Sequence, residues 1–295
     1  MRLRTGKNLH KNPSEADLSV NCVMRFKRKA SRVPGRHLAL LGTILLNSVP
    51  FFLHSEDDLG HPPANTFSIV AIDPDTGEMG VAVQSKIVAV GSICVYGSAD
   101  SGVIATQAYA NTRYGPMAQQ LLRIGLVPDQ VIALMTEHDP LKAQRQVAVL
   151  DRHGRVAAFT GDECIDWAGQ KVGDGYSVQG NLLAGPEVLD AMAEAFEKTE
   201  GLLAERLIAA LRAGQEKGGD KRGKQSAALV IVREGWGYGG MNDRARDVRV
   251  DDHEDPIEEL ARIYELHRKM FRRPKIAPAF PDEQPEKDEK DEDSE

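Results

Sequence analysis

The order in which strand-forming and helix-forming segments follow one another limits the folds open to this chain. Strand-like segments occupy 66–108 and two helical segments occupy 114–137. Strands, two helices, strands and a final helix follow in that order up to residue 271. Blocks of this kind argue against a doubly wound parallel sheet, in which strands and helices alternate one by one. We therefore predict an α+β fold in which two antiparallel sheets pack together and helices cover the outer faces.

Individual segments are assigned from their residue pattern. Residues 81–83 and 227–232 are continuous apolar runs, as expected of strands that are covered on both faces. Asp255 before Pro256, with Glu258 in the first turn, is typical of a helix start with a capping box. The expected strands are 66–72, 79–84, 87–95, 103–108, 146–150, 155–160, 164–167, 176–179, 227–233 and 247–250, and the expected helices are 114–124, 128–137, 186–198, 202–217 and 256–271.

The two ends of the chain differ in composition from the part between them. Residues 1–40 contain ten Lys and Arg against Glu15 and Asp17, and an apolar run at 38–53 follows, an order typical of an export signal. The run is short for a membrane span and no Ala-x-Ala site follows it, so a cleaved signal and an uncleaved anchor both stay open. Residues 282–295 hold nine Asp and Glu against two Lys, which is typical of a solvated, disordered end.

These patterns divide the chain into three parts. We predict a leader at 1–65, a domain at 66–272 and an acidic tail at 273–295. A working signal would export the domain to the periplasm or the exterior, or hold it at a membrane. Without a working signal the protein would be cytoplasmic. Because the basic residues concentrate in the leader and not on a folded face, we expect no nucleic-acid partner.

Cysteines and acidic residues give little support for a metal site. Cys22, Cys94 and Cys164 form an odd set without CxxC spacing, which argues against a zinc site or a disulfide framework. A Cys94–Cys164 pair stays open for an exported domain. The acidic run 251–255 has the oxygen ligands that Ca²⁺ or Mg²⁺ prefers, but the capping box explains about half of it. We therefore expect neither a metal nor a cofactor.

Thr66 opens the first strand of the domain, directly after the predicted leader. If the chain is cut before it, a hydroxyl and a free α-amine belong to one residue, which combines a nucleophile with a general base. An α-amine has a pKa of about 7.7–8.0 in reference peptides, so it is partly neutral at physiological pH and can accept the hydroxyl proton. The other interpretation is an ordinary β-branched residue that starts a strand.

Seven segments of the domain carry a resemblance to a known family. They are 66–71 (TFSIVA), 80–86 (GVAVQSK), 105–108 (ATQA) with Asn111 and 114–115 (YG), 158–161 (AFTG), 179–185 (QGNLLAG), 218–227 (GGDKRGKQSA) and 250–256 (VDDHEDP). Together they resemble the bacterial domain-of-unknown-function family one thousand and twenty-eight, assigned to the N-terminal-nucleophile (Ntn) hydrolase superfamily. The resemblance covers about 66–270 and implies a four-layer αββα sandwich, with no established substrate.

The same resemblance implies a condition for activity. Members of the family often begin Met-Thr, so that removal of the initiator methionine exposes the threonine. Here Asn65 precedes Thr66. Cleavage of the Asn65–Thr66 bond, by the protein itself or by another protease, is therefore required before Thr66 can act as an N-terminal nucleophile.

Three further residues are candidates for catalysis under this resemblance. Lys86 follows a strand expected to pair with that of Thr66, and its charge would favour the neutral α-amine. Asn111 and Asn181 could donate hydrogen bonds to a developing oxyanion, as the chemistry requires. The alternatives are an exposed lysine at a strand end and buried amides that hold loops together.

Substrate binding is assigned to polar residues close to these. Two residues after Thr66, Ser68 faces the same side of the strand. The guanidinium of Arg222, in a polar glycine-rich loop, could hold a substrate carboxylate, although a flexible connector has a similar composition. The full set of expected substrate-binding residues is Ser68, Ser85, Gln107, Gln179, Asp220 and Arg222.

Two functions from different classes follow. The first is an Ntn-type hydrolase of amide bonds with a small-molecule or peptide-like substrate, in which Thr66 attacks the carbonyl. The second is a non-catalytic domain of the same fold that serves binding or assembly, and an uncleaved leader would favour it. A homodimer, and membrane attachment through the leader, complete the expected partners.

Overall fold

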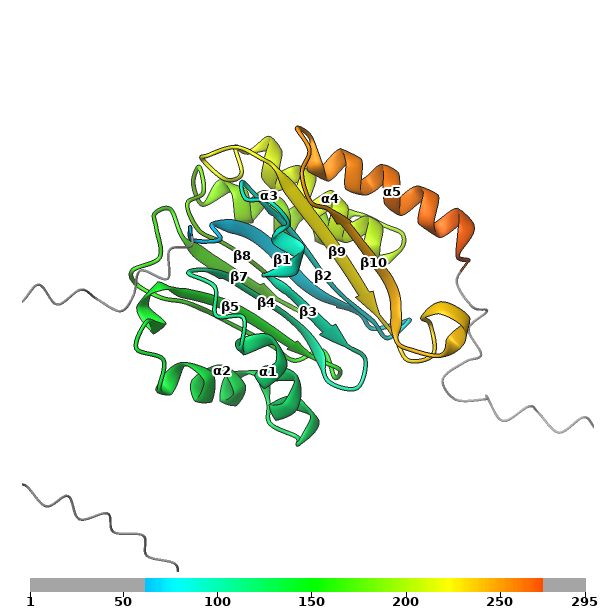
Figure 1. The fold of residues 1–295 in the computed structure, drawn as a ribbon, viewed down its shortest axis with the longest axis horizontal. Coiled ribbons are helices and arrows are strands. Elements are labelled where there is room, and N and C mark those ends of the chain that lie inside the picture. The colour runs from blue at the N-terminus through cyan, green and yellow to red at the C-terminus, as the bar shows by residue number, and fades with distance from the viewer. Residues whose placement is uncertain (1–61, 273–295) are drawn as a thin grey trace, which may run out of the picture. The chain divides into compact units, whose positions relative to one another are not determined.

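Two antiparallel sheets form the centre of the computed structural model, which describes residues 62–272 (Figure 1). Within this range the larger sheet has the strand order β10-β9-β2-β1-β8-β7 and the smaller one the order β3-β4-β5-β6. The strands are β1 (Thr66–Asp73), β2 (Glu78–Ser85), β3 (Val95–Ser98), β4 (Gly102–Ala108), β5 (Arg145–Asp151), β6 (Val156–Thr160), β7 (Gly169–Gly173), β8 (Tyr176–Gly180), β9 (Ser226–Val232) and β10 (Arg244–Val250).

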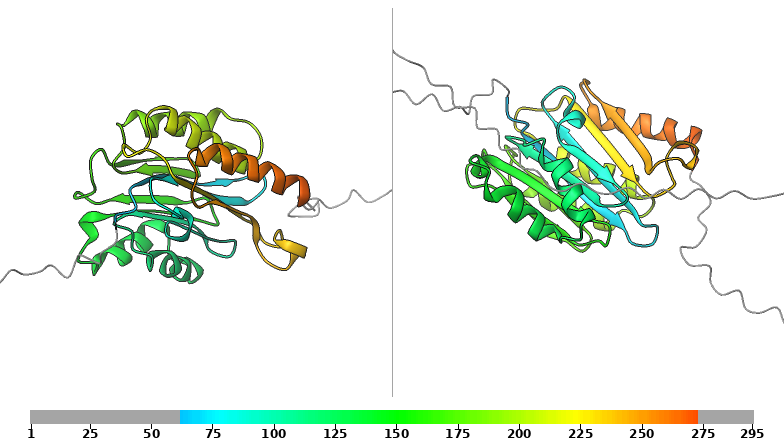
Figure 2. Two further views of the ribbon diagram at one scale, coloured as in Figure 1. Left: turned by 45° about the horizontal axis from the view of Figure 1, so that its top comes forward. Right: turned by 60° about the horizontal axis from the view of Figure 1, so that its bottom comes forward.

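Helices cover the outer face of each sheet, so the elements lie in four layers (Figure 2). Helices α3, α4 and α5 pack on the larger sheet, and α1 and α2 pack on the smaller one. The predicted α+β fold, with two antiparallel sheets and helices outside, is confirmed. The helices are α1 (Tyr114–Arg123), α2 (Pro128–Glu137), α3 (Glu187–Lys198), α4 (Leu203–Glu216) and α5 (Pro256–Met270), with 3₁₀ turns at Val90–Ser92, Lys142–Gln144 and Tyr238–Gly240.

Strand β1 is buried on both faces and positions the site. Phe67 and Ile69 pack with the helices of the outer layer, whereas Val70 packs between the two sheets. Because side chains alternate along a strand, Thr66 and Ser68 share the face of Val70 and point between the sheets. The apolar runs without polar alternation are explained in the same way, since both faces of these strands are covered.

Two expected strands are wrong. Over 87–95 the chain forms a 3₁₀ turn, and strand β3 begins only at Val95. Ala89 has a φ of 55°, a left-handed conformation that an extended strand cannot contain. Over 164–167 the backbone of Ile165 and Trp167 accepts hydrogen bonds from the loop at 182–183 instead of from a strand. Both segments are loops whose apolar residues pack against the sheets. A short run of apolar residues looks the same in the sequence whether it forms such a loop or a strand.

The expected capping box at α5 is also wrong. Asp255 is the N-cap residue and Pro256 follows it, as predicted, but the Asp255 carboxylate makes no cap hydrogen bond. It pairs with Lys224 Nζ at 2.6 Å, and Glu258 pairs with Arg212 at 2.6 Å. Long-range ion pairs have therefore replaced the local contacts that the sequence spacing suggested.

Several expectations concern residues that lie outside 62–272. They are the apolar run at 38–53 with its export signal or anchor, nearly all of the leader, and the tail at 273–295. Within the described part of the chain, none of the helices combines the length and the apolar character that crossing a membrane requires.

A buried ion pair holds the helical layer of the smaller sheet in place. Arg145 of β5 donates to the Asp139 carboxylate at 2.9 Å, and both side chains are less than a tenth exposed. The same carboxylate accepts from Tyr114 Oη at 2.7 Å and from Asn111 Nδ2 at 3.0 Å. Burial alone would raise the pKa of Asp139, but these hydrogen bonds, with that of Arg145 the strongest, hold it well below its usual value.

We predict that Asp139→Asn lowers the free energy of unfolding by about 3 kcal/mol at neutral pH, because the Arg145 charge is left buried without its partner. The folded-state pKa of Asp139 lies below its unfolded value, so its stabilisation is complete above about pH 4 and is lost as the pH falls towards the folded-state pKa. Urea unfolding at a series of pH values should show the difference shrinking in acid. Asp162→Asn, at an exposed position, is the control. A constant difference down to acid pH would contradict this explanation.

Candidate functional site at the start of strand β1

Thr66 is completely buried at the first position of β1. Its hydroxyl donates a hydrogen bond to the Ala64 carbonyl at 2.7 Å. Its own carbonyl oxygen accepts from the Asn181 backbone N–H at 3.1 Å and from Gln107 Nε2 at 3.3 Å. The residue is thus fixed on both sides by strands and loops from distant parts of the sequence.

The peptide bond before Thr66 is held by two side-chain donors. The Asn65 carbonyl oxygen accepts from Ser85 Oγ at 2.5 Å and from Arg222 Nη2 at 2.7 Å. Ser85 is placed there because it lies directly opposite Thr66 in the antiparallel pair of β1 and β2. Hydrogen bonds of this kind withdraw electron density from the carbonyl and are the donors that a developing oxyanion needs.

Asp220 fixes the position of Arg222. Its carboxylate accepts from Arg222 Nε at 3.0 Å and from Nη2 at 2.7 Å, a bidentate arrangement. The Asp220 side chain is fully buried, and it also accepts from the Lys86 backbone N–H at 3.3 Å. Asp220 therefore acts on the Asn65 carbonyl through Arg222, and its buried charge is balanced by that guanidinium.

A network of buried amides connects the two sheets behind Thr66. Ser68 Oγ donates to Gln107 Oε1 at 2.7 Å and accepts from Gln179 Nε2 at 2.6 Å. Gln107 Nε2 donates in turn to Gln146 Oε1 at 2.7 Å. These four side chains are completely buried, so each hydrogen bond replaces one that water would otherwise make.

Asn181, directly after β8, joins the same network. Its Nδ2 donates to Gln146 Oε1 at 2.9 Å, while Gln146 Nε2 donates to the Gly180 carbonyl at 2.9 Å. Within residues 62–272, the Asn181 Oδ1 atom and the Asn65 Oδ1 atom are buried without a hydrogen-bond partner. Two unpaired acceptors therefore flank Thr66, in a site whose other amides are paired.

Most of the expected site residues are brought together. Thr66 belongs to the amide network together with Ser68, Gln107, Gln179 and Asn181. Ser85 and Arg222 donate hydrogen bonds to the Asn65 carbonyl, and Asp220 holds Arg222 in place.

Lys86 and Asn111 are directed elsewhere. Lys86 is exposed, and its Nζ donates to the Lys224 carbonyl at 3.3 Å. Asn111 uses its amide on Asp139 and its Oδ1 on the Arg113 N–H, so its side chain holds the loop before α1. Of the two hypotheses for Asn111, its contacts agree with that of an amide that holds loops together.

Two residues of the site were missed by sequence reasoning. Gln146 is the centre of the amide network. The one sequence feature that could have indicated its role is that it is a polar residue at the start of an otherwise apolar strand. Cys94 lies beside Thr66; burial raises the pKa of this thiol to about 12, and the nearby Thr66 hydroxyl lowers it only in part. The thiol is therefore protonated at neutral pH. Cys94 and Cys164 are free and buried in the described structure, so the pair that stayed open is not formed.

The acidic run 251–255 has other partners. Asp251 pairs with Arg249 at 3.0 Å, and Asp252 accepts from Gln225 at 3.1 Å. His253 Nδ1 accepts from the Asp255 N–H at 2.9 Å. In the described range 62–272, no group of three or more His, Cys, Asp or Glu side chains is arranged to hold a metal ion.

Comparison with known proteins shows which family this chain belongs to. The model of a family of unknown function, DUF1028, matches residues 66–260. A crystal structure of a protein from Silicibacter pomeroyi, assigned to the same family, is similar with 33% identity and a TM-score of 0.63, over 70% of this chain and 90% of that one. The comparison with curated proteins gave no match. The chain therefore belongs to the DUF1028 family.

Proposed function

We propose that residues 66–272 form an Ntn-type hydrolase of amide bonds, in which Thr66 becomes the nucleophile when the Asn65–Thr66 bond is cleaved. One observation carries the proposal: the carbonyl of the bond to be cut accepts hydrogen bonds from Ser85 and Arg222, at 2.5 and 2.7 Å. The match to the family begins at Thr66, which supports a functional unit that starts there. The four-layer arrangement is also consistent with an Ntn-hydrolase-like sandwich.

Cleavage by the protein itself needs no further group for the attack. Thr66 Oγ1 can add to the Asn65 carbonyl carbon, because the atoms between them close a five-membered ring. Ser85 and Arg222 stabilise the oxyanion that forms. The C–N bond then breaks, the hydroxyl proton passes to the leaving nitrogen, and the acyl group is held as an ester on Thr66. Addition of water releases the carboxylate of Asn65 and restores the hydroxyl, now beside a free α-amine.

The released amine supplies the base for turnover. Its pKa of about 7.7–8.0 in reference peptides leaves it partly neutral near pH 7 and able to take the Thr66 proton. Departure of Asn65 also frees Ser85 and Arg222, which can then bind a substrate carbonyl or carboxylate. Asn181, whose Oδ1 is unpaired and whose backbone N–H donates to the Thr66 carbonyl at 3.1 Å, is a further polar residue within reach of a substrate.

Removal of the segment before Thr66 would leave a groove for the substrate. Pro63 lines two neighbouring clefts of about 370 and 130 Å³, whose other walls include Tyr109 and Ile165. Ala64 bridges to Ala108, the last residue of β4, in antiparallel register, so the segment lies beside the end of that strand as an extended peptide would. A substrate that presents an extended, peptide-like acyl group would occupy the same place.

A non-catalytic domain for binding or assembly is the second candidate. The observation that favours it is that Thr66 is wholly buried while Asn65 is attached, and that Lys86 is directed away from it. Under this alternative the chain before Thr66 stays in place and the polar network serves only to hold the sheets together.

We predict that the purified protein is cleaved to a chain that begins Thr-Phe-Ser-Ile-Val, because the bond before Thr66 is both polarised and next to its nucleophile. Intact-protein mass and N-terminal sequencing measure this. Thr66→Ala should remain uncleaved and folded, and Thr66→Ser, which keeps a hydroxyl, should still be cleaved. Thr199→Ala, which alters a half-buried threonine after α3, is the control. A wild-type chain that keeps residues upstream of Thr66 over prolonged incubation would contradict the proposal.

Ser85→Ala should slow this cleavage about 100-fold, since it removes one of the two oxyanion donors. Ser226→Ala is the matched control, because Ser226 lies opposite Ser85 in the same sheet and donates to the Ile87 carbonyl instead. The rate is read from the loss of precursor after synthesis in a cell-free system, with circular dichroism as the test of folding. Equal rates for Ser85→Ala and wild type would show that this hydroxyl takes no part.

A further inference from the structure

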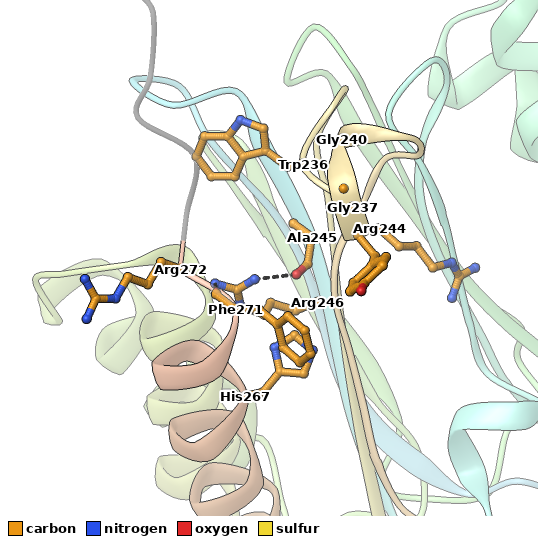
Figure 3. Close-up of a pocket in the computed structure, with 11 residues that line it drawn as sticks. Trp236, Gly237, Gly240, Arg244, Ala245, Arg246, His267, Phe271 and Arg272 are labelled. Atoms are coloured by element: carbon orange, nitrogen blue, oxygen red, sulfur yellow. Dashed lines mark hydrogen bonds between the residues drawn. The ribbon is translucent and has the colours of Figure 1, made fainter.

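Figure 3 shows a cleft of about 550 Å³ beside β10 and the end of α5. It lies at the other end of the larger sheet from Thr66. Strand β9 starts at Ser226, in register with Ser85 and Thr66, and ends at Val232, where the loop that walls the cleft begins. Six residues of extended strand span about 20 Å. The cleft is therefore separate from the Thr66 site, and its function is independent of the proposed hydrolase.

Three arginines and one histidine line this cleft, and Arg244 among them is paired with Asp247. Arg244 and Arg246 of β10, and His267 and Arg272 at the end of α5, line it, and no Asp or Glu is among its lining residues, all of which are described. Arg246 is only 8% exposed, and its guanidinium donates to the carbonyls of Ala245 and, at 3.1 Å, Phe271. Backbone carbonyls are thus among the groups that hold this cation at the wall.

Aromatic side chains form the remaining surface. Tyr238 is 80% exposed and meets the edge of Phe271 with ring centres 6.1 Å apart, and Phe271 lies 4.7 Å from the His267 ring. Trp236 carries the guanidinium of Arg233 over its face at 4.4 Å. Exposed aromatic surface beside fixed polar groups, in a cleft of this volume, is typical of small-molecule sites.

One polar atom of the cleft is unsatisfied. His267 Nδ1 is buried and has no hydrogen-bond partner within residues 62–272. Burial, with a smaller contribution from Arg246, lowers the pKa of His267, so the ring is neutral at physiological pH. An unpaired buried polar atom is costly, and a ligand oxygen placed between Arg246 and His267 would satisfy it.

We propose that this cleft binds a small aromatic carboxylate, with the carboxylate against Arg246 and His267 and the ring against Tyr238 and Phe271. The positive charges of Arg246 and Arg272 at the wall favour an anion. Planar guanidinium and carboxylate groups are complementary in shape. Exposed aromatic rings select an aromatic body, which stacks on them or meets them at the edge.

Phenylacetate is the probe, and phenylacetamide, of the same shape but without charge, is the matched ligand. In the full-length Trp167→Phe chain, Trp236 is the sole tryptophan, so its fluorescence reports on the cleft. We expect saturable binding of phenylacetate with a dissociation constant of about 1 mM or below, a range that its small size allows. Phenylacetamide should bind about tenfold more weakly or worse.

Variants locate the binding site. Tyr238→Ala, at an exposed position, and Arg246→Met should each weaken phenylacetate binding several-fold, and Arg262→Ala, on the same helix α5 but paired with Glu259, should not. Should Arg246→Met fail to fold, Tyr238→Ala still tests the site. Bound carboxylate should also raise the pKa of His267, which histidine-ring NMR measures. Equal binding of the acid and the amide, or unchanged binding in Tyr238→Ala, would overturn the proposal.

Discussion

The burial of β1 on both faces is the constraint from which the rest of the site follows. A strand in the middle of a sheet, with helices on one side and a second sheet on the other, has no contact with water. Its polar side chains must then be paired inside the protein, because an unpaired buried polar group costs about 1–3 kcal/mol. Ser68 is paired with Gln107 and Gln179, and these in turn require Gln146 and Asn181.

A network of this kind makes the geometry around Thr66 rigid. Each amide has its donors and acceptors assigned by its neighbours, and such fully paired networks tend to specify one arrangement. The exceptions lie beside Thr66, where Asn65 Oδ1 and Asn181 Oδ1 are buried and unpaired within the described residues. Pairing is therefore incomplete where a substrate would have to be bound and released, which accords with the proposed use of the site. Gln84 of the neighbouring strand β2 is a further buried amide without a partner within the described residues.

The sequence predicted the architecture better than the site. Blocks of strands and helices sufficed for two antiparallel sheets with outer helices, because each amphipathic element has only one way to bury its apolar face. The period of a strand placed Thr66 and Ser68 on one face, and the resemblance to the family selected Ser85, Gln107, Gln179, Asn181, Asp220 and Arg222. Local spacing failed at 87–95 and at the start of α5, where contacts with distant residues decide the conformation.

Contacts between distant residues also explain the site residues that differ from expectation. Asn111 is occupied by Asp139, whose other partners lie in α1 and β5, and no local pattern indicates that arrangement. Gln146 enters the site because β5 packs against β1, and Cys94 because the turn before β3 packs against β2 and β9, next to Ala64. A polar residue at the start of an otherwise apolar strand was the available signal for Gln146. The contact of Cys94 with Thr66 becomes visible only when the two sheets are assembled.

The acyl shift to Thr66 is the central claim, and hydroxylamine tests it most directly. This nucleophile attacks an ester far faster than an amide, so it intercepts the acyl group on Thr66 Oγ1. The account predicts accelerated cleavage of the full-length chain, with a fragment that ends in the hydroxamate of Asn65 and a second that begins at Thr66. Mass spectrometry identifies both. A chain that stays intact in hydroxylamine, or a fragment that ends anywhere else, would contradict the account.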